Sequence, residues 1–389
     1  MTEILLWAGY FAVFAFLVHK GRSKDAVLSG SVGFGVQAFA YVATYISAVA
    51  LVGFGGLAHA YGLQMLLVAA GNVWFGTWAV YRFLAWPTRK WQERLGARTP
   101  AQLLGLGHGS PSLTRAMAFV FALFLGVYGS AVIKGAALLL AEILPVPVWA
   151  LIWLVAIILG LTVFIGGLRG VLYTEAMQGV VMLVGMLMLV GAIFSKVGGP
   201  WEGMQALAAL PPSDLANNGF VSLSGGERGL FILSLVVVTS IAVWAQPQMM
   251  QRHFAIADPR QLKKTTPLAM FILTVLVGGA YFAAALSRLI LPEVASPDQV
   301  MPKLVQMLLP EFALHIFVLA IVSASLSTAT GIYHIAVSAL SEDLRGRPSN
   351  RLSWFTGIAI CVLVSGGCAQ IKGQLVALLC TTSWSIVGA

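Results

Sequence analysis

The chain has 389 residues, of which 59% are hydrophobic and 10% charged, and its mean hydropathy is +0.89. Because a soluble domain carries about a quarter charged residues, this composition excludes water as the main solvent of the chain. The net charge of +9 could suggest a nucleic acid partner, but the basic residues lie in short connections between apolar segments, which accounts for the excess without one.

The basic residues are distributed unevenly between the two sides of the apolar segments. Of the 23 lysines and arginines, seventeen lie in alternate connections, five lie at the opposite ends, and Lys134 alone lies inside a segment. Membrane proteins keep such an excess in their cytoplasmic connections. We therefore expect a multi-pass protein of the cell (inner) membrane, surrounded by the lipid bilayer, with its amino terminus outside.

Eleven apolar segments follow one another along the chain, and each is long enough to cross most or all of a bilayer. They cover residues 4–18, 32–57, 63–84, 116–140, 148–165, 171–194, 229–244, 268–291, 312–340, 354–368 and 375–389. Lipid offers the backbone no hydrogen-bond partner, so helices are the expected state of every segment. The sequence predicts one transmembrane domain over residues 1–389, in which residues 1–25 form a leading helix.

Interruptions in the second and seventh segments suggest two structural repeats. The second segment contains five glycines, which weaken a helix or let another backbone approach closely. The seventh is short and ends at Pro247. Broken helices at matching places in two halves are typical of inverted-repeat transporters. We expect one repeat over residues 26–197 and a second over residues 229–389, with its last helix truncated because the final segment ends without a polar flank.

Small hydroxyl residues lie at mid-membrane depth in the second segment, at residues 43–48, and in the ninth, at residues 323–330. A sodium ion takes about five or six oxygen ligands, and hydroxyls together with carbonyls freed at a helix break supply them without a formal charge. The alternative is that these hydroxyls pack the helices together and bond to carbonyls of their own helix. Composition alone leaves both interpretations open.

Several motifs, in matching order and spacing, resemble the sodium:solute symporter family over essentially the whole chain. Residues 43–48, Ala-Thr-Tyr-Ile-Ser-Ala, resemble its first core helix, above all in the sodium/pantothenate branch. Residues 166–169 and 174–179 resemble its Gly-Gly-x-x and Thr-Asp-x-x-Gln-Gly signature. Residues 247–252 resemble its Pro-Gln-x-x-x-Arg stretch, and residues 324–343 resemble its ninth span.

The resemblance implies a fold of leucine-transporter type, with five plus five helices in an inverted repeat after one leading helix, here incomplete at the carboxyl terminus. It also implies that a sodium ion drives transport. The ligands that it assigns to sodium are the carbonyl oxygens of Ala43, Ile46 and Ala324 and the hydroxyl oxygens of Ser327 and Thr328. Hydroxyls at positions i and i+1 and a carbonyl at i−3 lie near one edge of a helix, which would face the break in the partner helix.

The chain departs from the family pattern at two positions. Tyr45 stands where some relatives carry an acidic residue, so a carboxylate contribution to sodium binding is missing there. Glu175 replaces the more usual aspartate at the cytoplasmic mouth of the sixth segment. Glu175 and Gln178 are candidates for gating or ion release, and the alternative is that Glu175 is an interfacial acid that pairs with Arg169.

Lys134 lies near the middle of the fourth segment, where inserting a lysine costs about 2.5 to 3.5 kcal/mol, so we expect it to face protein or a water-filled cavity. Three roles are open for it: attracting a substrate carboxylate, modulating coupling as a protonatable cation, or bonding to helix carbonyls as a structural lysine. With Thr44, Tyr45, Ser47 and Trp244 it forms the set of substrate-cavity candidates, although packing is the favoured role of Trp244.

The sequence therefore predicts a secondary active transporter that moves sodium and a small organic solute, a carboxylate being favoured, by alternating access. The alternative is a symporter-like sensory membrane domain of a signalling protein. No constellation of residues suggests an enzyme or a metal site other than one for sodium. The oligomeric state stays open.

Overall fold

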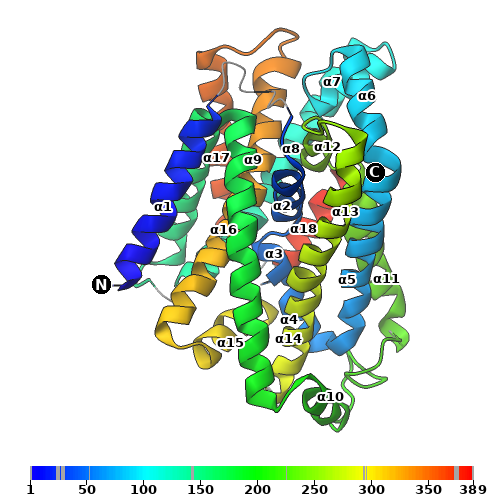
Figure 1. Ribbon diagram of the computed structural model, residues 1–389, viewed down its shortest axis with the longest axis vertical. Helices are drawn as coiled ribbons and strands as arrows, with labels where there is room; N and C mark the ends of the chain where they lie inside the picture. Colours follow the sequence, from blue (N-terminus) through cyan, green and yellow to red (C-terminus); the bar gives the residue numbers. More distant parts are fainter. Residues whose placement is uncertain are drawn as a thin grey trace.

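The computed structural model describes residues 2–22, 27, 31–51, 53–141, 144–224, 226–291, 294, 296–371 and 376–387. Most of these residues form helices that run along the long axis of the molecule (Figure 1). Eight helical segments among them are long and apolar enough to cross a membrane. Eleven spans were expected, and the difference arises because two pairs of predicted spans run together and the last described helix is short.

Four of the predicted spans are continuous helices. They are α1 (Thr2–Gly21), α8 (Pro111–Ala141), α16 (Glu311–Ser338) with its π-helical extension η9 (Ala339–Asp343), and α17 (Arg351–Ala369). Their surroundings differ, since 17% of the apolar window of α1 is buried and 78% of that of α16. A helix that is apolar on all sides belongs in the interior, so α16 is the central helix of the molecule and α1 lies at its periphery.

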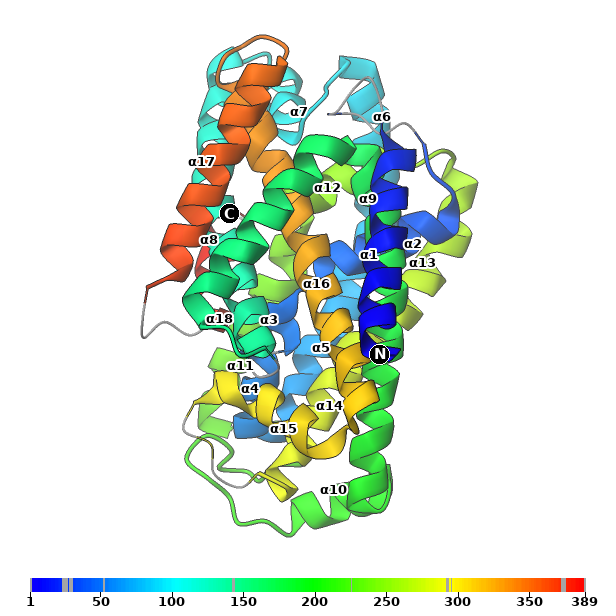
Figure 2. The same cartoon turned by 90° about the vertical axis from the view of Figure 1, so that its left-hand side faces the viewer.

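Predicted spans five and six together form α9 (Val148–Val197). Its 50 residues would extend about 75 Å as one straight helix, far more than the roughly 30 Å of a hydrocarbon core. The helix turns sharply at Gly167, whose φ of 53° and ψ of −170° favour glycine, and Figure 2 shows the two arms at an angle to each other. The two arms therefore correspond to two separate spans, as the sequence predicts.

The other spans consist of shorter helices joined by breaks or by short stretches of 3-10 or π helix. The second and third contain α2 (Phe34–Tyr45), α3 (Ala48–Leu51), α4 (Gly53–Tyr61), η1 (Gly62–Met65), α5 (Leu66–Val73), η2 (Trp74–Leu84) and α6 (Ala85–Leu95). The seventh contains α11 (Gly229–Val236), η4 (Val237–Ile241) and η5 (Ala242–Trp244), and the eighth contains α13 (Pro259–Leu273), η6 (Thr274–Gly278), α14 (Gly279–Leu286) and η7 (Ser287–Leu289). The short helix α12 (Pro247–His253) lies between these two spans.

The break in the second span does not lie at its glycines. It lies at Ile46, whereas Gly53, Gly55 and Gly56 belong to α4. A side-chain carbon on Gly56 would stand 2.2 Å from the carbonyl oxygen of Pro297, so close packing is the role of this glycine. Close approach of another element is thus the role of Gly55 and Gly56, whereas Gly33 and Gly35 have no atom within 4 Å of such a carbon.

Short helices lie at the two ends of the bundle. They are α7 (Pro100–Gly107), α10 (Pro200–Ala208), η3 (Gly226–Arg228), η8 (Pro297–Gln299) and α15 (Val300–Leu308). A further short helix, α18 (Val376–Val387), lies midway along the bundle against α8. Figure 1 shows α6 and α7 at one end and α10 at the other. With 12 residues, α18 is too short to count as a span, and residues 375 and 388–389 of the predicted last span lie outside the described residues.

Candidate functional site

The second span is interrupted between α2 and α3. Ile46 takes an extended conformation, with φ −95° and ψ 118°, directly after α2 ends at Tyr45. The hydroxyl oxygen of Ser47 accepts a hydrogen bond of 3.2 Å from the N–H of Val49 and so caps the start of α3. Because the last carbonyls of a helix have no intrahelical donors, the carbonyl oxygens before this break are released for other partners.

The hydroxyl group of Thr328, on the central helix α16, meets three of these carbonyl oxygens. Thr328 Oγ1 lies 3.0 Å from the carbonyl oxygen of Thr44, 3.1 Å from that of Ile46 and 3.3 Å from that of Ala43. A hydroxyl group has one hydrogen to donate, so it cannot satisfy all three oxygens at once. Unshared lone pairs therefore converge at a buried point beside Thr328, an arrangement that suits a hard cation.

Ser327 supplies a second hydroxyl to the same cluster. Its Oγ donates to the carbonyl oxygen of Ala43 at 2.6 Å and lies 3.1 Å from that of Ala324, one turn earlier in α16. Ser327 and Thr328 are fully buried. The structure thus brings together all five residues predicted as sodium ligands, which we name the oxygen cluster: Ala43, Ile46, Ala324, Ser327 and Thr328.

A buried ion pair adjoins the oxygen cluster. The guanidinium of Arg252, in α12, forms a hydrogen-bonded ion pair with Glu175 of α9, and both side chains are fully buried. Arg252 Nε also donates to the hydroxyl of Thr44 at 3.0 Å. Thr44 therefore joins the two sites, because its carbonyl oxygen belongs to the break in α2 while its hydroxyl contacts the ion pair.

The alternative pairing of Glu175 with Arg169 is wrong. Arg169 lies exposed near Tyr173, at 3.5 Å from the tyrosine hydroxyl, whereas Glu175 points into the bundle. Residues i and i+6 point about 120° apart around a helix, so α9 turns Arg169 away from the face on which it buries Glu175.

Several amide side chains around the ion pair have polar atoms without a partner. Among the described residues, neither amide atom of Gln178 or Gln251 makes a hydrogen bond of normal geometry, and Gln178 faces the Tyr10 hydroxyl. Buried polar atoms of this kind are usually satisfied by ordered water. Beside them, outside the eight spans, burial lowers the pKa of His253 to about 3, so its imidazole is neutral at physiological pH.

The substrate-cavity candidates are placed differently from one another. The Tyr45 hydroxyl donates to the carbonyl oxygen of Thr239 at 2.6 Å, and the Trp244 indole donates to that of Phe75 at 2.9 Å. These bonds hold the second and third spans against the seventh. The cavity that borders Ile46 measures about 10 Å³, enough for about one water molecule.

Lys134 lies half-buried two turns before the end of α8. Its ammonium donates to the carbonyl oxygen of Ile371 at 3.1 Å. This contact is of the type expected for a structural lysine. Its role, like those of Thr44, Tyr45, Ser47 and Trp244, stays a prediction.

Comparison with known proteins assigns the chain to a family. A sequence model described as the sodium:solute symporter family matches residues 27–366. The chain belongs to the sodium:solute symporter family. The sodium/pantothenate symporters of Haemophilus influenzae and Escherichia coli are 27% and 28% identical to it, over 85% and 81% of this chain and 69% and 65% of theirs. The high-affinity proline transporter PutP of Bacillus subtilis is 25% identical over 87% of this chain and 71% of its own.

A solved structure supports the same fold. A Na⁺-coupled sialic acid symporter in a substrate-bound outward-open state superposes with a TM-score of 0.78 and 15% identity, over 99% of this chain and 86% of that one. The predicted fold class, an all-α membrane protein of leucine-transporter type, is thereby confirmed. The relatives of this symporter-family chain are transporters rather than enzymes, in agreement with the sequence-based expectation.

For two buried polar residues of this family member, no role was predicted from the sequence. Arg252 was noted as part of a motif but given no role, and Asn72 was not noted at all. Asn72 Oδ1 accepts hydrogen bonds of 2.9 Å from the hydroxyls of Thr239 and Ser240 and so connects the third span to the seventh. Both residues could have been found as polar side chains in or next to predicted spans, where such residues are uncommon and usually face protein.

Proposed function

We propose that this chain transports a small organic solute together with sodium by alternating access, and that the oxygen cluster binds the sodium. The observation that carries the proposal is the convergence of Thr328 Oγ1 with the carbonyl oxygens on both sides of the break in α2. This site has no formal charge of its own and lies in the buried centre of the bundle. Oxygen ligands without a carboxylate suit a monovalent cation better than a divalent one, since less charge needs to be balanced.

In this proposal the ion lies among the oxygens of the five cluster residues and replaces their direct hydrogen bonds. The hydroxyls of Ser327 and Thr328 would then turn their lone pairs toward sodium instead of donating to the backbone. The site lies between α2 and α16, so an occupied site holds the two helices together. Release of the ion frees them to separate, which links sodium binding to the change of access.

We propose a carboxylate as the solute class. The sodium/pantothenate symporters among the relatives carry a carboxylate substrate in their name, and they match most of this chain. The substrate-cavity candidates Thr44, Tyr45 and Ser47 lie at the break in α2, adjacent to the proposed ion site. Half-helices that point their ends at a midplane site are the usual binding arrangement of such transporters.

Glu175 and Gln178 are proposed to control release toward the cytoplasm. The ion pair between Glu175 and Arg252 joins α9 to α12, so α12 cannot move away from α9 until the pair separates. The amide of Gln178 lies one turn further along α9, where it could hydrogen-bond to water that enters from the cytoplasmic side. The distribution of basic residues supports the orientation that this assignment needs, with the amino terminus outside.

Uptake into proteoliposomes tests the proposal. An imposed sodium gradient should drive accumulation of at least one solute from a set of labelled carboxylates, amino acids and sugars. Uptake that follows a proton gradient and ignores sodium would contradict the ion assignment. A protein that binds sodium but moves no solute would favour the sensory alternative.

Paired variants test the ligands. Ser327→Ala combined with Thr328→Ala should raise the sodium concentration for half-maximal uptake by at least about tenfold, since two oxygen ligands are lost. Ser325→Ala is the matched control, because this buried hydroxyl of the same helix bonds to Ile321 of α16 at 3.0 Å rather than to α2. Equal sodium dependence in both variants would rule out Ser327 and Thr328 as ligands.

A further inference from the structure

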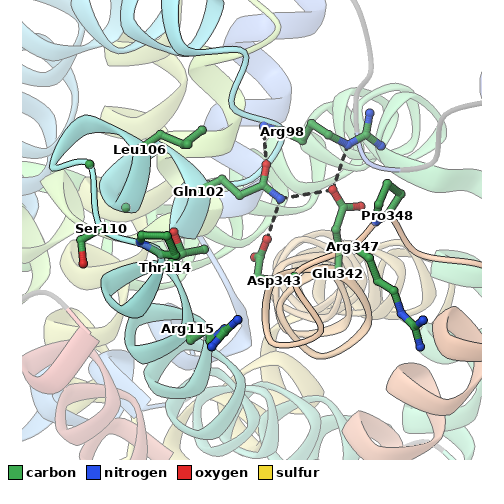
Figure 3. Close-up of a pocket in the computed structure, with 14 residues that line it drawn as sticks. Arg98, Gln102, Leu106, Ser110, Thr114, Arg115, Glu342, Asp343, Arg347 and Pro348 are labelled. Carbon is green, nitrogen blue, oxygen red and sulfur yellow. Dashed lines mark hydrogen bonds and ion pairs between the residues drawn. The ribbon is translucent and has the colours of Figure 1, made fainter.

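A cavity of about 570 Å³ lies at the end of the bundle that carries α6 and α7. Its walls come from α7, the first turns of α8, and η9 with the turn that follows it (Figure 3). The lining contains three arginines, Arg98, Arg115 and Arg347, and two acids, Glu342 and Asp343, which leaves a net charge of +1. Nothing in the proposed transport cycle uses this cavity.

The two acids are already engaged by the protein. Asp343 accepts hydrogen bonds from the Thr99 hydroxyl at 2.9 and 3.0 Å and from the Gln102 amide at 2.8 Å. Glu342 Oε1 accepts one from Arg98 Nε at 2.9 Å and one from the Gln102 amide at 3.2 Å. Figure 3 shows the side chains of Arg98, Gln102, Glu342 and Asp343 pointing toward one another. They fasten α7 to the end of the central helix and present little free charge to a ligand.

The remaining oxygen of Glu342 does not change this conclusion. Glu342 Oε2 has no hydrogen bond within the described part of the chain, but it is shut off from solvent, and the residue as a whole is 3% exposed. A ligand in the cavity therefore cannot reach it without a rearrangement of α7. The acids form a closed floor under the cavity rather than a cation site.

The three arginines differ in whether their guanidinium groups are already bonded within the protein. Arg98 is held by Glu342, whereas the guanidinium groups of Arg115 and Arg347 are exposed and make no hydrogen bond or ion pair with any described residue. Gly346 takes φ +63°, and Arg115 Nη2 lies 3.8 Å from where a side-chain carbon on it would stand. This tight turn places the chain around Arg347 over the guanidinium of Arg115. Two guanidiniums without an acid thus line one cavity.

The start of α8 adds to the positive potential. Ser110 caps this 31-residue helix by accepting the N–H of Leu113 at 3.2 Å, and it lines the cavity with Thr114. The first turn of a helix carries a partial positive charge and favours anions. A planar guanidinium group binds phosphate oxygens through two parallel hydrogen bonds, and Arg115 and Arg347 each offer one such group to the cavity.

We propose that this cavity binds a phosphate ester, with Arg115 and Arg347 on the phosphate and with Ser110 and Thr114 beside the alcohol portion. A volume of about 570 Å³ falls within the range of roughly 300 to 1,000 Å³ found for small-molecule sites and exceeds the needs of phosphate alone. The ester is either a soluble metabolite or the headgroup of a phospholipid in the adjacent leaflet. A phosphate ester bound from the cytoplasmic side would contact the end of α16, the helix that carries the proposed sodium ligands.

Titration with glycerol 3-phosphate tests the proposal. The full chain is purified in detergent, and binding is followed by calorimetry at constant ionic strength. A titration with sodium chloride in place of the ester is the blank. Saturable binding at one site is expected. Arg115→Gln combined with Arg347→Gln should weaken it about a hundredfold, since two charge-assisted contacts are lost. Arg94→Gln combined with Arg351→Gln is the control, because it removes the same charge from exposed positions outside the cavity.

The outcomes are distinguishable from one another and from a failure of the transport proposal, because no transport is measured. Absence of binding in the wild type, or equal weakening in both double variants, overturns the site. Repeating the titration in nanodiscs separates the two sources. If phosphatidylglycerol raises the apparent Kd relative to phosphatidylcholine, the ligand is a lipid headgroup; an unchanged Kd assigns a soluble ester.

Discussion

Two polar clusters touch Thr44, and they differ in where their positive charge comes from. In the oxygen cluster, hydroxyls of α16 face carbonyl oxygens of α2, and more lone pairs converge there than the available hydrogens can satisfy. In the neighbouring cluster the carboxylate of Glu175 receives a guanidinium from the chain itself, that of Arg252. The second cluster takes its positive charge from the chain itself, whereas we propose that the first takes it from sodium in solution.

The largest effect is expected where the internal charge is removed. Arg252→Met leaves Glu175 buried without a partner, and breaking one side of a buried pair costs about 3 to 5 kcal/mol. Size-exclusion chromatography of this variant should therefore show only a small peak of folded protein. Adding Glu175→Gln should restore a large part of it, because the unpaired charge is then gone.

Arg169→Met is the control for that comparison, since Arg169 is exposed and lies six residues before Glu175 in α9, just after the bend at Gly167. If Arg169→Met lost as much folded protein as Arg252→Met, the buried pair would not be the reason for the instability.

A smaller effect is expected from crowding the ion pair. A side-chain carbon on Gly331 would stand 2.7 Å from Arg252 Nη2 and 3.4 Å from a methyl carbon of Thr44. Gly331→Ala should therefore lower stability by about 1 to 3 kcal/mol, measured as a lower midpoint of thermal unfolding in detergent. Gly191→Ala, where no atom lies within 4 Å, should leave the midpoint nearly unchanged. A shift of the same size at both positions would contradict the close approach of Arg252 to α16.

The oxygen cluster is expected to respond in sodium dependence more than in stability. Thr328→Val keeps the shape of the side chain but removes its hydroxyl, so the sodium concentration for half-maximal uptake should rise by about tenfold, or about 1.4 kcal/mol. Thr328→Ser keeps the hydroxyl and should stay within a few-fold of the wild type. Should the two variants behave alike, the hydroxyl of Thr328 would not be a ligand.

The smallest effect is expected at Lys134. Because its ammonium donates to the Ile371 carbonyl oxygen, Lys134→Met should change the apparent affinity for a carboxylate substrate by less than about twofold and cost about 1 kcal/mol of stability. Parallel uptake of an anionic and a neutral substrate provides the measurement. A selective loss of anion uptake would instead assign Lys134 to the substrate.

Much of the fold and part of the candidate site follow from the sequence. Hydropathy depends on local composition, so the spans, including the two arms of α9, could be read without any knowledge of packing. The proposed sodium ligands come from two short motifs whose neighbours in space are set by the fold. Once the resemblance supplied that fold, Ala43, Ile46, Ala324, Ser327 and Thr328 could be expected in one place, and the structure brings them together.

The partners of single charged side chains were decided by the tertiary structure alone. A residue six positions earlier, Arg169, was one candidate partner of Glu175, but Glu175 pairs with a residue 77 positions later in the chain. Lys134 bonds to a residue 237 positions later. Helical periodicity predicts which face of a span a residue occupies, and not which residue of a distant helix packs against that face. The tertiary structure also decided where the second span breaks. The break lies at Ile46, where α16 supplies partners for the freed carbonyl oxygens, and not at the glycines of this span.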